Sequence, residues 1–270
     1  MPGAKGTIAA PPRRAPAATA LLVLTAAALL CGLRTAVMAE CKCDVSNKGK
    51  AVKGYDITPT GLKPRYPEGF QCSPLTSLYA SWIDVDGSIR DEIHSGVDGG
   101  RLGDQIVAPG PGVVRAVWRA NWGWGQEGAL LIRHTGNDLN LPSERPFYFS
   151  EFDHLRFDEI NHFQVGDRIS RGEPLAHVFR PGGDKQYLPE VHWEVWEISQ
   201  DDELTWRTNK YGGRYWGNDS GRLIDPLYLL ARNTSPDANG GVLLTPFVAD
   251  RDYREFRGFT YILPCQRRTT

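Results

Sequence analysis

The stretch Glu190–Ile198, which reads EVHWEVWEI, predicts the fold more directly than any other part of the sequence. Large apolar residues alternate in it with polar ones, and side chains two positions apart lie on the same face of a β-strand. One face therefore carries Val191, Trp193 and Val195, and the other carries Glu190, His192 and Glu194. The stretch predicts a core strand over Val191–Ile198 that presents a histidine between two carboxylates.

Other short apolar stretches surround this strand in the sequence. Residues 105–108 and 112–118 flank a turn at 109–111, and residues 129–134 and 147–152 have the composition of two further strands. Helical periodicity is scarce throughout the chain. We therefore expect a mainly β protein with an antiparallel β-sheet core domain.

Two kinds of connecting segment stand out. Residues 165–176 place two glycine turns around short apolar runs, which predicts a lipoyl-like glycine hairpin, but a lipoyl carrier needs a lysine at the hairpin tip and the segment has none. Residues 136–146 and 200–222 are predicted loops. The second loop either forms the wall of a groove or packs within the domain through its aromatic residues Trp206, Tyr211, Tyr215 and Trp216.

The first 39 of the 270 residues differ from the rest and resemble a secretory signal. Basic residues precede an uncharged apolar run at 17–33, and Val37-Met38-Ala39 supplies small residues where a signal peptidase reads them. The alternative is an uncleaved membrane anchor, because the run is almost long enough to span a bilayer. The cleavage-site residues favour removal after Ala39, which predicts a secreted or periplasmic protein without stable membrane insertion.

Removal of this segment makes the chain more acidic. It takes away 4 of the 31 basic residues and none of the 32 acidic ones, which leaves 27 basic and 32 acidic residues, a net charge of −5. Nucleic-acid binding requires a basic face, so we expect no nucleic-acid partner.

Four cysteines remain after residue 39, an even number that suggests two disulfides in an oxidising compartment. Cys41 and Cys43 are too close in sequence to pair with each other without strain. We therefore expect each of them to pair with Cys72 or Cys265. A thiolate metal site is the alternative, but the spacing does not match a zinc knuckle.

The chemistry-bearing residues begin with His94 and Asp98, which are four positions apart in the segment HSGVD. This pair alone is a weak signal, but His192 on the polar face of the core strand adds a third candidate ligand. Two imidazoles and one carboxylate give one Zn²⁺ ion three protein ligands and leave a position for water, as in catalytic zinc sites. The metal would then lower the pKa of water and polarise a scissile carbonyl.

Six segments occur in an order that resembles the lysostaphin-type (LytM-like) zinc metallopeptidases, which cleave peptide cross-links in bacterial cell walls. These segments are HSGVDGG, GDQIVAPGPGVVRAV, YFSEFDHL, VGDRISRGEPLAHV, VHWEVW and IDPLYLL, and together they span about half of the chain, from His94 to Leu230. The resemblance implies a metallopeptidase domain over residues 85–230. Before it lies an N-terminal arm (40–84), and after it a C-terminal extension (231–270) that serves as a lid or as a structural cap.

The resemblance also implies a role for single residues. His94, Asp98 and His192 match the zinc ligands, and His154 matches one of two histidines that stabilise the developing oxyanion. The second such histidine belongs to a His-x-His motif, which here reads Glu190-Val191-His192. Glu190 then either acts as the general base, as carboxylates do in other zinc peptidases, or marks a silent site, because a carboxylate has the wrong charge to stabilise an oxyanion.

Two functions follow from these alternatives. The first is an exported zinc metallo-endopeptidase that hydrolyses peptide bonds in peptidoglycan, with Glu190 and His154 as its catalytic pair. The second is a catalytically degenerate zinc-binding module that binds the wall or regulates another hydrolase, and a regulatory protein is then the partner.

The remaining polar candidates have weaker patterns. His134 ends a predicted strand and is expected to be structural, while His162 lies in a polar loop and His177 on a predicted strand. Glu194 shares the face of His192 and is either a partner of that ligand or an ordinary surface carboxylate.

Overall fold

The computed structural model describes residues 57–85, 87–90, 92–122, 126–144, 146–180, 188–199, 205–209, 212–217 and 221–268. All of them belong to one compact unit, Gly49–Thr270. The predicted export signal, Cys41 and Cys43 lie outside the described residues. Within these ranges, no helix is both long and apolar enough to cross a membrane.

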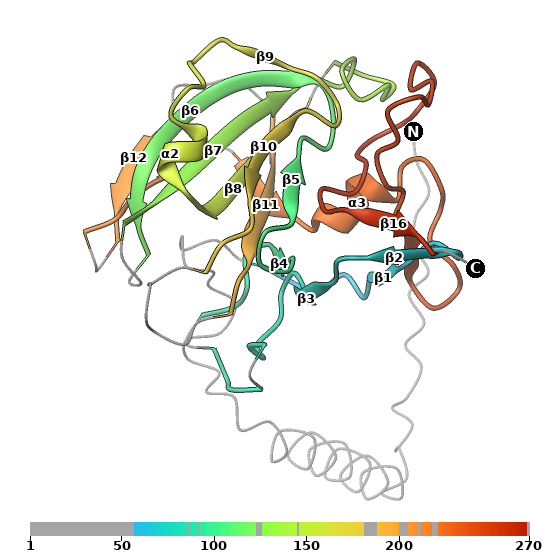
Figure 1. Cartoon of the computed structure of the whole chain (residues 1–270), viewed down its shortest axis with the longest axis horizontal. Helices are drawn as coiled ribbons and strands as arrows, with labels where there is room; N and C mark the ends of the chain where they lie inside the picture. Colours follow the sequence, from blue (N-terminus) through green and yellow to red (C-terminus); the bar gives the residue numbers. More distant parts are fainter. Residues whose placement is uncertain are drawn as a thin grey trace, which may run out of the picture. The chain divides into compact units, whose positions relative to one another are not determined.

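An antiparallel sheet of eight strands forms the centre of the protein, and Figure 1 shows its long members side by side as a curved layer. All of its strand pairs are antiparallel, which confirms the predicted fold class. β14 (Gly221–Ile224) pairs with the second half of β11. The other seven strands follow the order β3 (Leu75–Ser77), β4 (Val97–Gly99), β11 (Val191–Ile198), β8 (Phe147–Leu155), β7 (Gln126–His134), β6 (Gly112–Asn121) and β9 (Arg168–Ile169).

The strand predicted from the alternating stretch is β11, and its bounds agree with the prediction. Trp193 and Val195 on its apolar face are fully buried, as expected. Its polar face is buried as well, because Glu194 is only 1% exposed. Buried carboxylates need partners, so the polar face of β11 must meet a set of matching groups.

In the part of the chain that the structure describes, four two-stranded sheets and two short helices complete the fold. The helices are α2 (Phe157–Ile160) and α3 (Pro226–Leu230), and the Asp225 carboxylate caps α3 by accepting from the Leu227 N–H. The strand pairs are β5 (Gln105–Val107) with β10 (Pro174–His177), β12 (Thr205–Thr208) with β13 (Arg214–Gly217), β1 (Lys63–Arg65) with β15 (Gly241–Leu243), and β2 (Phe70–Cys72) with β16 (Cys265–Arg267).

The glycine-rich segment 165–176 provides β9 and most of β10. β9 pairs with β6 and β10 pairs with β5, so the two strands join two different sheets. The turn around Gly172, between β9 and β10, therefore links the central sheet to the small β5–β10 sheet, whereas the turn around Gly166 precedes β9.

The prediction of an irregular loop over residues 200–222 is wrong. β12 and β13 form an antiparallel pair there, in which Trp206 lies opposite Trp216. Trp216 is fully buried and its ring lies 5.0 Å from that of Trp196, whereas Trp206 is half-buried beside Trp118. Of the two alternatives predicted for these aromatic residues, packing within the domain is therefore correct for Trp216. Tyr211 lies outside the described residues.

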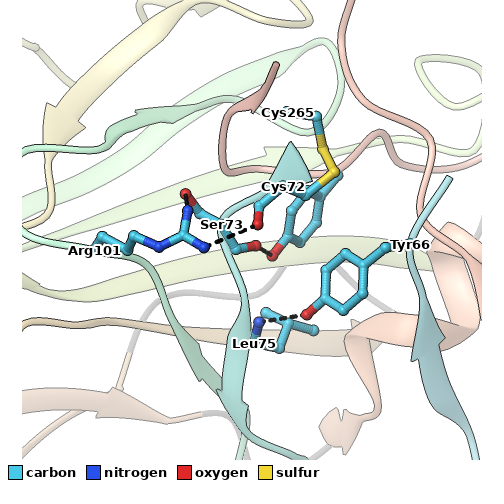
Figure 2. Close-up of a disulfide and its surroundings, with 7 residues drawn as sticks. Tyr66, Cys72, Ser73, Leu75, Arg101 and Cys265 are labelled. Atoms are coloured by element: carbon cyan, nitrogen blue, oxygen red, sulfur yellow. Dashed lines mark hydrogen bonds between the residues drawn. A yellow bond between two sulfur atoms is a disulfide. The ribbon is translucent and has the colours of Figure 1, made fainter. Parts of the chain in front are cut away.

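The predicted disulfide pairing is also wrong, because Cys72 bonds to Cys265 (Figure 2). Neither is therefore available to Cys41 or Cys43. The two cysteines are direct partners in the β2–β16 register, which brings their Cα atoms to 3.9 Å. Spacing along the chain could not reveal this pairing, because the bond joins residues 193 positions apart.

Hydrogen bonds on both sides of the disulfide attach it to the rest of the domain. As Figure 2 shows, Arg101 donates to the Cys72 carbonyl at 3.4 Å and to the Ser73 hydroxyl at 3.3 Å. The Tyr66 hydroxyl accepts from the Leu75 N–H at 2.8 Å, at the start of β3 in the central sheet. The disulfide therefore joins the C-terminal strand to the chain that leads directly into the central sheet.

The C-terminal residues pack against the apolar side of β11. The Phe259 ring lies 5.7 Å from that of Trp193, and Phe259, Tyr261 and Leu263 are all buried. Since Trp193 and His192 point to opposite faces of the strand, this segment covers the side away from His192. Its position favours the structural cap over the lid.

His134 at the end of β7 is structural, as predicted. It is completely buried, its Nδ1 donates to the Pro111 carbonyl at 2.6 Å, and its Nε2 accepts from the Ser150 hydroxyl at 3.1 Å. Burial lowers the pKa of His134 to about 4, so the ring is neutral in the folded protein at neutral pH.

This shift predicts a loss of stability in mild acid. His134 in the unfolded chain binds a proton below its ordinary pKa of about 6.5, whereas in the folded protein it does so only near pH 4. Its contribution to stability is therefore complete above about pH 6.5 and is lost as the pH falls towards 4, by roughly 3 kcal/mol. Chemical denaturation of wild type and His134→Gln across this range measures the difference.

The exposed His177 provides the control for this measurement. His177→Gln should keep the wild-type dependence of unfolding free energy on pH, whereas His134→Gln should flatten it. Equal pH slopes for His134→Gln and wild type would contradict the assignment.

Candidate metal centre

Two neighbouring strands bring the predicted ligands together. In the β4–β11 pair, Asp98 lies directly opposite His192. His94 precedes β4, and backbone hydrogen bonds with Ala80 and Ser81 fix its position. Three residues from two distant parts of the chain therefore meet because the strand register places them side by side.

Gly96 allows the close approach between these two parts of the chain. A Cβ atom at this position would lie 2.3 Å from the carbonyl oxygen of Trp193, a contact that real side chains do not make. Only glycine lets the backbone between His94 and Asp98 pass this close to β11.

The three candidate ligands present one atom each to a common point. His94 Nε2 lies 3.0 Å from Asp98 Oδ1, His192 Nδ1 lies 2.7 Å from the same oxygen, and the two nitrogens are 3.1 Å apart. The three residues are 4%, 3% and 9% exposed. The predicted set therefore forms a compact, buried group of two nitrogens and one oxygen.

Each candidate ligand is held by a second contact on its other side. His94 Nδ1 donates to the Leu78 carbonyl at 2.9 Å, and His192 Nε2 donates to the Glu194 carboxylate at 3.2 Å. Arg90 donates to Asp98 Oδ2 at 2.9 Å. These contacts engage the outer nitrogen of each ring, so that the inner nitrogens, His94 Nε2 and His192 Nδ1, both face Asp98 Oδ1.

The electrostatics of the centre follow from this crowding of charges. Burial raises the pKa of Asp98, but the adjacent His94 and His192 outweigh it and hold that pKa well below the ordinary value. Burial lowers the pKa of His192, but hydrogen bonds to Asp98 and Glu194 raise it well above the ordinary value.

The donor set fits a zinc ion. Zn²⁺ takes histidine nitrogens and carboxylate oxygens at about 2.0–2.2 Å, so tetrahedral ligand atoms lie roughly 3.3 Å apart. The separations of 2.7–3.1 Å between the three atoms are close to this value. The orientation of the two imidazoles supports the same conclusion, because each presents a ring nitrogen to the same point, where a metal ion would replace the protons that the group shares.

His154, the predicted catalytic histidine, lies beside this group. It belongs to β8, next to Asp153, which is paired with His192, and the rings of His154 and His192 are 6.2 Å apart. Its backbone has φ 58°, an uncommon value for a residue other than glycine and one often found at functional sites. Burial lowers the pKa of His154, but the charge of Glu127 and a hydrogen bond to it produce a net rise.

Glu190 and Glu194 occupy different environments on the polar face of β11. Burial and the charge of Asp98 raise the pKa of the half-buried Glu190 to about 7. Glu194 is deeply buried and contacts His192 Nε2, so it is a partner of that candidate ligand and the surface alternative is wrong. Asp153, His192 and Glu194 also have donor atoms within 4.8 Å of one another, but this set shares His192 with the main group.

The sequence did not reveal two residues of this site. Arg90 precedes the HSGVD segment and binds Asp98, and Glu127 on β7 binds His154. Charged residues at such positions are common on surfaces. The pairing of β7 with β8 places Glu127 beside the centre, and the backbone hydrogen bond from Arg90 to Trp82 helps to place Arg90 there.

No protein-family profile and no curated protein sequence matches the chain. Among solved structures, it is similar to a mutant catalytic domain of the prophage-encoded protein EnpA from Enterococcus faecalis (21% identity, 50% of this chain and 85% of that one, TM-score 0.33). It is also similar to a zinc-containing peptidase from Vibrio cholerae (21% identity, 53% and 38%, TM-score 0.33). A third is the catalytic domain of lysostaphin from Staphylococcus simulans (16% identity, 50% and 84%, TM-score 0.30).

Proposed function

We propose that the chain is an exported zinc metallo-endopeptidase that hydrolyses peptide bonds in bacterial cell-wall peptidoglycan. The observation that supports it most is the convergence of His94, Asp98 and His192 with His154 alongside. The ordered resemblance of six segments to lysostaphin-type peptidases supports the same class of substrate. Of the two functions considered from the sequence, the peptidase alone gives His154 and Glu190 a task.

Each residue would have a distinct task in this site. His94, Asp98 and His192 would hold one Zn²⁺ ion, which supplies Lewis acidity to a peptide carbonyl and acidifies water. Glu194, Arg90 and the Leu78 carbonyl orient these ligands. Glu190 would accept a proton from the attacking water, and His154 would donate a hydrogen bond to the oxyanion as it forms.

The export part of the proposal rests on the N-terminal sequence and on the disulfide. A hydrophobic run followed by a small-residue cleavage site is typical of secreted proteins. The Cys72–Cys265 bond fits an oxidising compartment outside the cytoplasm.

The general test is cleavage by the zinc-loaded chain from Glu40 onward. It is incubated with purified peptidoglycan and with glycine- and alanine-rich cross-bridge peptides, and new amino termini are counted. Metal-dependent release of amino termini supports the peptidase. Stoichiometric zinc without cleavage of any substrate favours the alternative, a degenerate module that binds the wall or regulates a hydrolase.

Replacing Glu190 by Gln tests the proposed base. The variant keeps the shape of the side chain but cannot accept a proton, so we expect kcat to fall by roughly 100-fold or more while the zinc content stays unchanged. Steady-state cleavage of a fluorogenic cross-bridge peptide measures the loss. Glu197→Gln is the matched control on the same strand, because Glu197 bonds to Arg222 at the protein surface. Wild-type kcat in Glu190→Gln would remove Glu190 from the mechanism.

A further inference from the structure

Glu127 and His154 form a buried carboxylate–imidazole pair at the edge of the centre. Glu127 Oε2 accepts a short hydrogen bond from His154 Nδ1, and the two residues are only 2% and 6% exposed. None of the predicted ligands shares this contact. The pair lies beside the metal centre, to which it is joined by the His154 ring next to His192.

The fold holds Glu127 in this position with little freedom. Glu127 lies at the start of β7, next to Gly128, which pairs with Leu155 of β8, and a register shift between Gly128 and Leu130 follows. A Cβ at Gly128 would lie 2.9 Å from the Phe157 Cα atom, so a larger residue would separate β7 from the segment that follows His154. Such irregularities re-aim side chains beside functional sites.

The second carboxylate oxygen of Glu127 also indicates a functional role for this residue. Oε1 is buried, and among the described residues it has no hydrogen-bond partner. An incompletely satisfied buried carboxylate is costly to retain in a fold, so it calls for an explanation in terms of function. Among the described residues, the negative charge of Glu127 faces the His154 ring, with which it forms an ion pair.

We infer that Glu127 is a positioning residue that holds His154 with its Nδ1 protonated and its ring turned towards the metal centre. This inference rests on the proposed function in so far as His154 is the catalytic histidine. A buried carboxylate that accepts from one imidazole nitrogen fixes the tautomer and stabilises the imidazolium form. In that form Nε2 also carries a proton, so His154 would donate a hydrogen bond to a substrate oxygen in an orientation that Glu127 sets.

The first test requires no substrate. NMR of the zinc-loaded chain labelled with ¹⁵N-histidine assigns the protonation of each ring nitrogen of His154. We expect Nδ1 to be protonated in the wild type and its protonated fraction to fall in Glu127→Leu. This variant replaces the carboxylate with an apolar side chain of similar size in the buried site. An unprotonated Nδ1 in the wild type, or an equally protonated Nδ1 in Glu127→Leu, would overturn the inference.

The second test uses catalysis and metal binding together. In Glu127→Gln, which preserves shape and removes charge, kcat for a cross-bridge peptide should fall by roughly 100-fold with KM nearly unchanged. Zinc affinity should stay within about threefold, because Glu127 contacts none of the ligands, whose own partners control affinity. A purely structural role would instead lower stability and leave kcat per folded molecule unchanged, which would also overturn the inference.

Glu159→Gln is the matched control for both experiments. Glu159 contacts His177 Nδ1 at 3.2 Å, so it is the same chemical pair on the protein surface. It should leave kcat and the His154 spectrum unchanged. If the wild type cleaves no peptide, the peptidase proposal fails, but the NMR result still decides whether Glu127 positions His154.

Discussion

Zinc affinity is expected to fall by well over 100-fold when Asp98 is replaced by Asn. The amide keeps the size of the side chain but removes the negative charge on the only oxygen donor of the group. Loss of a partner behind a ligand already costs roughly 10- to 100-fold in metal affinity, so loss of a charged ligand must cost more. Peptide cleavage should disappear together with the metal.

Competition with a chromophoric chelator measures the affinity directly. Asp158→Asn is the control, because Asp158 is an exposed carboxylate that pairs with its surface neighbour Arg156. The folded state must also be checked, since Asp98 bonds Arg90 as well as the histidines. A folded Asp98→Asn variant that binds zinc as tightly as the wild type would exclude this metal centre.

The second large effect is expected from the double variant Cys72→Ser/Cys265→Ser. The bond closes a loop over a sequence separation of 193 residues, and loops of this length give the greatest entropic stabilisation. We expect the free energy of unfolding to fall by about 2–5 kcal/mol. Urea denaturation monitored by tryptophan fluorescence measures the change, since several tryptophans are fully buried.

Replacing both cysteines avoids a free thiol that could pair elsewhere. Ser77→Ala is unsuitable as a control because Ser77 contacts His94. Ser170→Ala is the control, because Ser170 is an exposed residue in the turn between β9 and β10. This variant should shift the midpoint only slightly. If the double variant unfolds at the same urea concentration as the wild type, the bond does not stabilise this domain.

The sequence predicted those features that depend on local pattern. β11 was predicted with its correct bounds because apolar and polar residues alternate up to Val195 and large apolar residues continue to Ile198. The three candidate ligands were predicted because His, Asp and Gly occur at a characteristic spacing in HSGVD and because His192 lies on the polar face of that strand. The structure brings all three together.

Features that depend on long-range pairing were not accessible from the sequence. Cys72 and Cys265 bond because β2 and β16 are neighbours, and nothing near either cysteine indicates this. Glu127 and Arg90 were missed for the same reason, since their roles come from contacts across strands and loops. β12 and β13 were taken for a loop because Gly, Asn and Asp residues interrupt the aromatic pattern of residues 200–222.

The pairing of His192 with a strand on each side determines which unfolding motions can disrupt the site. Its backbone pairs with Asp98 on one side and with Asp153 on the other, within the interior of the central sheet. Fluctuations that fray an edge strand or a loop do not separate these three residues. Separating Asp98 from His192 requires an opening of the β4–β11 ladder inside the sheet, so backbone amides around His192 should exchange hydrogen far more slowly than those of the edge strands.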